Sequence, residues 1–263
     1  MPSPASIPCV HYSFNPWWGC TRLSAGCDHC YAAVIDARAG GDHWGADAPR
    51  RTFGDKYWAR PLKWDRDAAA SGTRERVLCA SMADVFDANA PAGQLPRLWE
   101  LIRRTPNLDW LLLTKRPGRI ARSLPSDWGE GYRNAWLGVS AEDAETARQR
   151  VPVLVDTPAR LRFVCCEPLL SPVDLRPWAA DLDWVIAGGE SGPSARPLHP
   201  DWARDLKDQC VEAGIPLFFK AWGGERAGRR LDGRIWQQLP HACAAPTLRE
   251  PPKDPDSRTG APP

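Results

Sequence analysis

The sequence predicts an α/β fold: a partial or complete (β/α) barrel, TIM-barrel-like, with parallel strands. Short apolar segments recur roughly every 25 to 30 residues, and amphipathic segments with helical periodicity lie between several of them. Because parallel strands need crossover connections, this alternation indicates a parallel sheet, and the number of units favours a barrel or partial barrel. The expected strands are residues 10–14, 76–81, 108–114, 135–140, 161–166, 182–187 and 215–219.

Helix signals lie between these strands. The Asp28 side chain can accept hydrogen bonds from free N–H groups, so we expect it to cap a helix over 32–38 with Cys30 in its first turn. Three longer segments combine a charged face with an apolar face, as expected of helices that cover a sheet. These helices are expected at 95–104, 141–151 and 200–213.

The rest of the chain lacks strong periodicity. Residues 40–75 are interpreted as a long insertion. Its cations and aromatic side chains can contact a phosphate-bearing or planar ligand, and the alternative interpretation is a solvated irregular loop. Residues 223–239 are expected to form a small hairpin, and the Pro-rich segment 246–263 is expected to be disordered. A single barrel domain is therefore expected over residues 1–245.

Composition restricts the class of protein. With 263 residues, of which 43% are hydrophobic, the chain can bury a full core. No apolar segment approaches the length of a membrane span, and the N-terminus lacks a signal-peptide pattern, so we expect a cytoplasmic protein without membrane contact. The net charge of +2 does not by itself indicate a polyanion partner. Six scattered cysteines are expected to be buried free thiols: Cys9, Cys79, Cys165, Cys166, Cys210 and Cys243.

The other three cysteines are gathered in one stretch. Cys20, Cys27 and Cys30 have the spacing C-x6-C-x2-C, and Gly19 and Gly26 permit sharp turns around them. Three thiolates at this spacing indicate an iron–sulfur cluster with one open iron, or a zinc site whose fourth ligand lies elsewhere. Three unrelated core cysteines are the third interpretation.

Polar side chains follow the expected strands at their carboxyl ends. In a parallel barrel these ends share one face, where active sites lie. The loop that holds Cys20, Cys27 and Cys30, called the cysteine loop below, follows the first strand onto the same face. At the sixth strand, Gly188 and Gly189 are expected to let a ligand approach the backbone, beside the carboxylate of Glu190. The polar groups at the strand ends are Asp84, Lys115, Arg116, Glu142, Glu167, Glu190 and Lys220.

Several short motifs resemble a family of phage and bacterial proteins of unknown function, the phage gene-product 37/68-like family. The resemblance runs from about residue 15 to residue 222. It includes the C-x6-C-x2-C-Tyr motif itself. The other matching motifs are Asn-Pro-Trp-x-Gly-Cys at 15–20, Ser-Met-Ala-Asp at 81–84, Leu-Leu-Thr-Lys-Arg-Pro at 112–117, Leu-Gly-Val-Ser at 137–140, Cys-Glu-Pro-Leu-Leu at 166–170 and Gly-Gly-Glu-Ser-Gly at 188–192.

This family looks like a divergent relative of radical S-adenosylmethionine (SAM) enzymes. The resemblance implies a [4Fe–4S] cluster held by Cys20, Cys27 and Cys30, whose open iron binds SAM. Two departures stand out. The usual motif is C-x3-C-x2-C, and the usual Gly-Gly-Glu follows the second strand, whereas here Gly188-Gly-Glu190 follows the sixth.

The resemblance also implies roles for the strand-end residues. Gly188, Gly189, Glu190 and Asp84 are assigned to SAM binding, while Glu167, Glu142 and Lys115 are assigned to catalysis. Glu167 and Glu142 are alternative partners for the SAM amine or ribose, and Lys115 and Arg116 suit an anionic substrate.

The sequence therefore predicts an iron–sulfur enzyme of the radical SAM type, generating a 5′-deoxyadenosyl radical to modify an unknown substrate. A nucleic acid or nucleotide is the expected substrate class, and a reductant protein is an expected partner. The alternative is a zinc-binding, non-catalytic nucleic-acid or protein interaction module of phage origin, with His29 or His11 as the fourth ligand. A third interpretation is a phage protein that acts only as the partner of another enzyme.

Overall fold

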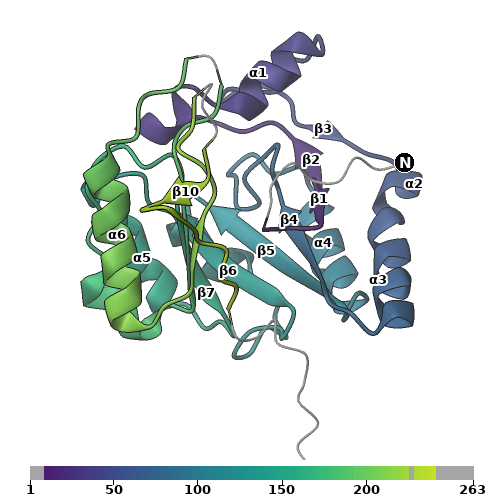
Figure 1. The fold of residues 1–263 in the computed structure, drawn as a ribbon. Coiled ribbons are helices and arrows are strands. Elements are labelled where there is room, and N and C mark those ends of the chain that lie inside the picture. Colours follow the sequence, from purple (N-terminus) through teal and green to yellow (C-terminus); the bar gives the residue numbers. More distant parts are fainter. Residues whose placement is uncertain (1–8, 193, 225–227, 241–263) are drawn as a thin grey trace, which may run out of the picture.

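The computed structural model describes residues 9–192, 194–224 and 228–240. Its centre is a sheet of seven parallel strands, which lie side by side in the order in which they follow one another along the chain (Figure 1). This sheet curls into a partial barrel, which confirms the predicted fold class. The strands are β1 (Tyr12–Phe14), β4 (Glu75–Cys79), β5 (Leu108–Thr114), β6 (Ala135–Ser140), β7 (Arg162–Cys166), β8 (Trp184–Ala187) and β9 (Leu217–Phe219).

Helices cover the outer face of the sheet. They are α3 (Arg60–Ser71) before β4, α4 (Gln94–Arg103) before β5, α5 (Ala144–Val155) before β7 and α6 (Pro200–Ala213) before β9. The connection from β5 to β6 contains the 3₁₀ turns η2 (Pro117–Arg119) and η3 (Ala121–Ser123), and the connection from β7 to β8 contains η4 (Arg176–Asp181). The expected strands 108–114 and 135–140 and the expected helix 200–213 are confirmed without a shift.

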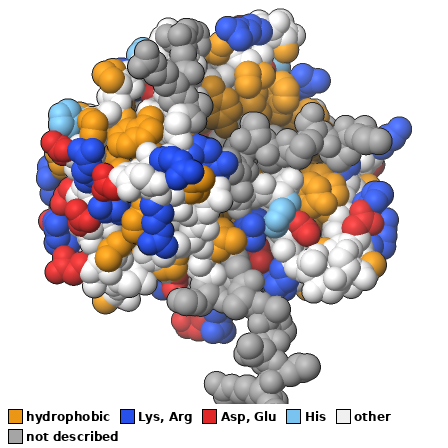
Figure 2. Space-filling model, viewed as in Figure 1, with side chains coloured by type: hydrophobic (Ala, Val, Ile, Leu, Met, Phe, Trp, Pro, Cys, Tyr) orange, Lys and Arg blue, Asp and Glu red, His pale blue; other side chains and the backbone are white. Residues whose placement is uncertain are grey.

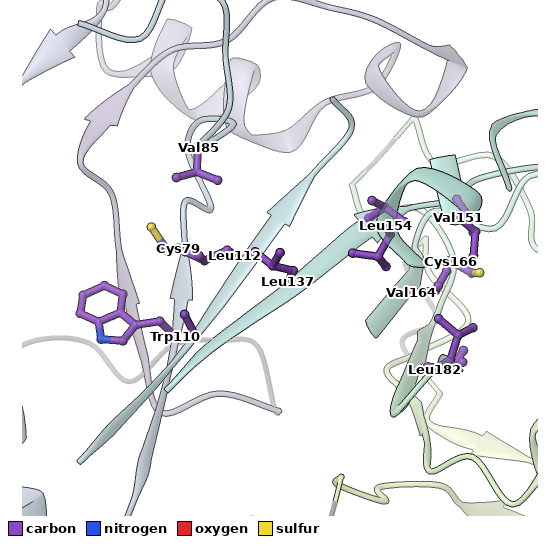
Figure 3. Close-up of a cluster of buried hydrophobic side chains, with 14 of the residues drawn as sticks. Cys79, Val85, Trp110, Leu112, Leu137, Val151, Leu154, Val164, Cys166 and Leu182 are labelled. Carbon is purple, nitrogen blue, oxygen red and sulfur yellow. The ribbon is translucent and has the colours of Figure 1, made fainter. Parts of the chain in front are cut away.

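Side chains alternate between two faces along each strand, as the pleat requires. On β5, Trp110 and Leu112 join the large apolar core beneath the helices, whereas Leu111 faces the concave inner side. Figure 3 shows side chains of the outer core from the strands meeting Val151 and Leu154 of α5. The inner face holds its own cluster, built mainly from Leu111, Trp136, Phe163, Cys165, Trp184, Ile186 and Phe218.

The start of α5 lies three residues later than expected. Asp143 is the N-cap, because its side chain accepts a hydrogen bond from the backbone N–H of Thr146 at 2.7 Å and the Thr146 hydroxyl accepts one from the backbone N–H of Asp143. This capping box leaves Glu142 outside the helix, at the end of β6. The cap therefore places a predicted site residue at the carboxyl ends of the parallel strands, the edge of the sheet called the rim below.

Two local expectations were wrong. The segment 40–75 is not an irregular loop, because it contains β3 (Arg51–Thr52), α2 (Asp55–Trp58) and α3. Helix α3 buries only three side chains, Pro61, Trp64 and Ala68, so its apolar face is too narrow to give a clear periodicity. Asp28 does not cap α1 (Tyr31–Arg38) either: the N-cap is Cys30, and it makes no side-chain cap hydrogen bond.

Short elements complete the fold. Strand β2 (Trp17–Trp18) pairs antiparallel with β3, beside the cysteine loop, and η1 (Ala25–Cys27) lies within that loop. The expected hairpin within 223–239 is confirmed as β10 (Arg230–Leu231) and β11 (Arg234–Ile235). The segment 246–263 lies outside the described residues, as does Cys243. Among the helices of the described ranges, none has the length and apolar character to span a membrane.

Candidate active site

The carboxyl ends of the parallel strands bring the expected polar side chains onto one rim, where they form ion pairs. Arg116 pairs with Asp84 at 2.8 Å, and Lys115 pairs with Glu142 at 3.0 Å. Farther along the rim, Lys220 pairs with Glu167; its Nζ lies 2.6 Å from Oε1. The charged side chains of these three pairs on the rim therefore neutralise one another.

The cysteine loop lies on this rim and is held by two arginines and a glutamate. Arg116 donates to the backbone oxygen of Thr21 at 2.5 Å, and its Nη1 lies 3.6 Å from Sγ of Cys20. On the other side, Arg196 donates to the backbone oxygen of Ala25 at 2.8 Å. Glu142 accepts a hydrogen bond from the Ser24 hydroxyl at 3.1 Å. The loop is thus fixed to the segments that follow β5, β6 and β8 at once.

Gly26 shows how closely the loop approaches the rim. A Cβ at this position would lie 2.5 Å from Oε1 of Glu142, closer than real Cβ contacts come. Glu142 cannot move aside easily because Lys115 and Arg150 hold its two oxygens. Gly26 is therefore required by close packing of the loop against a buried carboxylate.

The third cysteine begins a helix whose first residue, Tyr31, contacts the sheet. The Tyr31 hydroxyl donates to the backbone oxygen of Ser81, beyond the end of β4, at 2.8 Å. His29, just before Cys30, places Nδ1 2.9 Å from Oε2 of Glu190. These two contacts fix the segment that carries Cys30.

A buried arginine organises the far side of the loop. The Arg50 side chain is almost fully buried; it pairs with Asp87 at 2.7 Å and donates to the hydroxyl of Thr21 at 2.8 Å. The same guanidinium donates to the backbone oxygens of His43, Gly45 and Ala48. Sequence reasoning missed Arg50 because it lies in the segment interpreted as irregular, where nothing in the local pattern marks it as buried.

Burial and neighbouring charges set the protonation of the site. Burial raises the pKa of Cys20 to about 12, although Arg116 beside it works in the opposite direction. Burial also works to raise the pKa of Glu142, but Lys115 and Arg150 hold it below the ordinary value. Burial works to lower the pKa of Lys115, and Glu142 raises it above the ordinary value. The Lys115–Glu142 pair is therefore fully charged at neutral pH.

Glu190 is the most strongly perturbed carboxylate on the rim. Burial works to raise its pKa, yet hydrogen bonds from Arg196 and His29 lower it to about 2. Arg196 binds both of its oxygens, at 2.6 and 2.9 Å. Arg196 was not singled out from the sequence, because it lies six residues beyond Glu190 in a segment without periodicity.

The two predicted glycines have packing roles at the end of β8. A Cβ on Gly189 would overlap the backbone oxygen of Trp222, and one on Gly188 would lie 3.2 Å from that of Ala221. The absent side chains therefore let the segment after β9 approach the β8 end. Residues 220–223 pass directly beside these glycines, and the approach of a ligand to this backbone stays a prediction.

The donor set of the loop consists of three thiols. Cys20, Cys27 and Cys30 are all free and partly buried. In the described part of the chain, no three His, Cys, Asp or Glu side chains are grouped to hold a single metal ion. A [4Fe–4S] cluster takes each thiolate on a different iron, so three separate thiols on one loop fit its chemistry.

His11 does not fit the role of fourth ligand. It precedes β1, and its Nδ1 accepts a hydrogen bond from the backbone N–H of Arg76, at the beginning of β4, at 2.8 Å. It also lies 2.9 Å from Glu75. His11 is therefore at the amino end of the sheet, opposite the cysteine loop. Of the two histidines considered, only His29 lies in the loop.

An exposed apolar patch borders the cysteines. Among the described residues, six large hydrophobic side chains are well exposed, and four of them lie in the loop or on α1: Leu23, Tyr31, Val34 and Ile35. Figure 2 shows hydrophobic side chains gathered near the top of the molecule, where Figure 1 places α1, with Lys and Arg side chains beside them.

Fold and site together define a class: a parallel α/β partial barrel that carries a three-thiol loop on the carboxyl rim of its sheet. The chain belongs to the family described as "Protein of unknown function (DUF5131)", whose model matches residues 4–240. No curated protein matched the sequence.

Solved structures with this fold include spore photoproduct lyase. Its complex with dinucleoside spore photoproduct aligns with a TM-score of 0.53 at 12% identity, covering 83% of this chain and 79% of that one. A mutant of the same lyase with a cysteine replaced by serine aligns with a TM-score of 0.52 at 12% identity and the same coverage. A tyrosine-to-phenylalanine mutant gives a TM-score of 0.50 at 11% identity, covering 81% of this chain and 75% of that one. At these identities the likeness shows the fold alone.

Proposed function

We propose that this protein is an iron–sulfur enzyme of the radical SAM type, in which Cys20, Cys27 and Cys30 hold a [4Fe–4S] cluster. The observation that carries the proposal is the anchored loop: three free thiols held on the carboxyl rim of a parallel partial barrel. The fold adds support, since it is shared with spore photoproduct lyase, a radical SAM enzyme. The same proposal includes membership in a phage gene-product 37/68-like group and a cytoplasmic location. It also includes a reductant protein as a partner.

When bound, the cluster with SAM would supply a 5′-deoxyadenosyl radical. The work of the protein is then to bind, orient and shield. Arg116 and Arg196 hold the loop through the backbone oxygens of Thr21 and Ala25, so they act as positioning residues. Arg116 also places a positive charge beside Cys20, which favours the thiolate needed for ligation.

The four rim carboxylates differ in how many partners they already have. Asp84 accepts from Arg116, Thr114 and two backbone N–H groups, and Glu142 is held by Lys115, Arg150 and Ser24. Glu190 is held by Arg196 and His29. These three carboxylates are engaged in shaping the rim.

Glu167 differs, because Lys220 is its only ion-pair partner among the described residues, and both side chains are partly exposed. A carboxylate with free lone pairs suits the ammonium group of SAM. We therefore assign the SAM amine to Glu167 rather than to Glu190. Lys115 and Lys220 remain the cations that an anionic substrate would meet.

Metal analysis after anaerobic purification tests the proposal. The wild-type protein should contain about four irons per chain after reconstitution, because three thiolates can hold a cubane with one open corner. Replacing Cys20, Cys27 or Cys30 by alanine should abolish iron binding. Cys165→Ala is the matched control, since Cys165 is a buried free thiol at the end of β7.

Turnover provides the second readout. Reduced with dithionite in the presence of SAM, iron-loaded protein should produce 5′-deoxyadenosine, and Glu167→Gln should weaken SAM binding while iron content stays unchanged. Stoichiometric zinc without iron uptake would instead support the zinc-binding interaction module. Iron-loaded protein that neither binds SAM nor yields 5′-deoxyadenosine would refute the radical SAM assignment.

A further inference from the structure

A row of aromatic and arginine side chains lies next to the cysteine loop. It runs from β2 through β3 and α2 to the start of α3, elements that Figure 1 shows in the right-hand half of the view. We call this row the arginine–aromatic stripe. Its members are Trp18, Arg51, Phe53, Tyr57, Arg60 and Trp64.

Each arginine of the stripe lies over two rings. The Arg51 guanidinium carbon is 5.1 Å from the ring centre of Trp18 and 5.5 Å from that of Phe53. Arg60 lies 5.4 Å from Tyr57 and 5.7 Å from Trp64. These distances are within the range of cation–π contacts.

The rings also contact one another, which joins the two halves of the stripe. Phe53 and Tyr57 stack with centroids 4.4 Å apart and an interplanar angle of 29°. Trp18 meets Phe53 edge-on at 6.0 Å. Trp18, Phe53 and Tyr57 are half-buried, whereas Arg51 and Arg60 are exposed. The two arginines are therefore exposed over a preformed aromatic base, whose fourth ring, Trp64, is buried.

The positive charge of the stripe is not neutralised within the described protein. Arg51 and Arg60 have no carboxylate within 4.0 Å among the residues described, and neither does the exposed Lys56 of α2, between them in sequence. Most other arginines near the site are paired; Arg50, for example, binds Asp87 at 2.7 Å. Unpaired cations on one stripe can therefore attract an anionic ligand, although the net charge of the chain is only +2.

The stripe is connected rigidly to the cysteine loop. Trp18 pairs in register with Arg51 across the β2–β3 ladder and lies two residues before Cys20. The Tyr57 hydroxyl accepts a hydrogen bond from the backbone N–H of Asn15 at 3.0 Å, and the Asn15 side chain accepts one from the backbone N–H of Met82 at 2.7 Å. A ligand bound along the stripe would thus be held in a defined place relative to the loop.

The chemistry of the stripe selects one class of ligand. An acidic peptide would use the cations but not the planar surfaces, whereas a polynucleotide strand offers planar bases and anionic phosphates in alternation. Duplex DNA hides the faces of its bases, so an unpaired strand is required. We propose that the arginine–aromatic stripe binds single-stranded nucleic acid and leads it to the cysteine loop. The chemistry at the end of that path rests on the proposed function; the binding does not.

Fluorescence anisotropy with a labelled oligodeoxythymidine of roughly 12 nucleotides tests this directly. The double variant Arg51→Ala/Arg60→Ala should weaken binding by roughly tenfold or more, because stacking surface and charge are both lost. The matched control is Arg133→Ala/Arg160→Ala, which removes the same charge from positions before β6 and β7, at the opposite end of the barrel. The control should change the affinity less than about twofold.

Two further measurements separate stacking from charge. Arg51→Lys/Arg60→Lys keeps the charge but loses the planar groups, so it should bind several-fold more weakly than wild type while keeping the same salt dependence. Polyglutamate should compete poorly with the oligonucleotide. Equal effects of both alanine doubles, wild-type affinity of the lysine variant, effective competition by polyglutamate, or no binding by the wild type would each overturn the proposal.

The outcome is independent of the cluster. Iron content and SAM binding are measured on the same stripe variants and should match the wild type, since no cluster cysteine or rim carboxylate is changed. Oligonucleotide binding without iron uptake would leave the stripe assigned and reject the proposed function. Iron uptake and SAM cleavage without oligonucleotide binding would support the proposed function and reject the stripe as a nucleic-acid site.

Discussion

Replacing Arg116 by alanine should loosen the cysteine loop and destabilise the whole barrel. The guanidinium lies 2.8 Å from Asp84 and donates to the backbone oxygen of Thr21 at 2.5 Å, and its side chain is only 10% exposed. Removing one partner of a buried ion pair costs about 3–5 kcal/mol when the remaining charge is left without compensation.

The expected loss is somewhat smaller, because Asp84 keeps other donors. The hydroxyl of Thr114 and the backbone N–H groups of Phe86 and Lys115 still bind its two oxygens. We therefore expect Arg116→Ala to lower the free energy of unfolding by about 2–4 kcal/mol. Arg116→Lys keeps the charge but cannot reach both Asp84 and Thr21, so about half of that loss is expected.

Urea unfolding of the protein at neutral pH measures this change, and iron uptake by the same samples measures the effect on the loop. Arg116→Ala should also load less iron than wild type, because Thr21 next to Cys20 loses its anchor. Arg133→Ala is the control for removing an arginine outside the rim. A change in unfolding free energy below about 0.5 kcal/mol together with wild-type iron content would refute this role of Arg116.

Two other substitutions test the rim and the inner core. Glu190 has its pKa lowered to about 2, so its stabilisation is complete above its ordinary value of 4.5 and disappears as the pH falls toward 2. Glu190→Gln should therefore lower the free energy of unfolding by about 1–2 kcal/mol at pH 7, after allowing for solvent near Arg196. Urea titrations should show that the difference in unfolding free energy between variant and wild type shrinks below pH 4.5. A difference that stays constant with pH would contradict this. Gly138→Ala would drive a Cβ into the Phe163 ring and should cost about 1–3 kcal/mol in thermal or urea unfolding, whereas Gly118→Ala meets no atom within 4 Å and should be nearly neutral.

The predictability of this fold varies with how its segments are buried. Strands β5 and β6 are apolar nearly throughout because helices cover one side and the inner cluster covers the other, so their limits are clear in the sequence. Helix α3 buries only one narrow face, and its charged residues hide the periodicity. Local pattern therefore fails where an element contributes few residues to the core.

The candidate site likewise has features that the sequence could predict and features that it could not. Parallel topology was enough to predict that Lys115, Glu142, Glu167 and Lys220 would meet on one rim, because all strands of a parallel sheet end on the same side. Which groups pair was not predictable, since an ion pair such as Arg196 with Glu190 depends on the path of an irregular loop. For the same reason the sequence did not show that Gly189 makes room for the Trp222 backbone.

The sequence by itself determined the parallel barrel, the gathering of three thiols and the face on which they lie, because these follow from periodicity, spacing and strand direction. Only the tertiary structure decided which side chains hold the loop. Arg50, Arg116 and Arg196 reach it from three separate segments, and each binds backbone oxygens that carry no sequence signal. Hydrogen bonds to the main chain depend on where the backbone passes, and that is fixed only when the whole chain has folded.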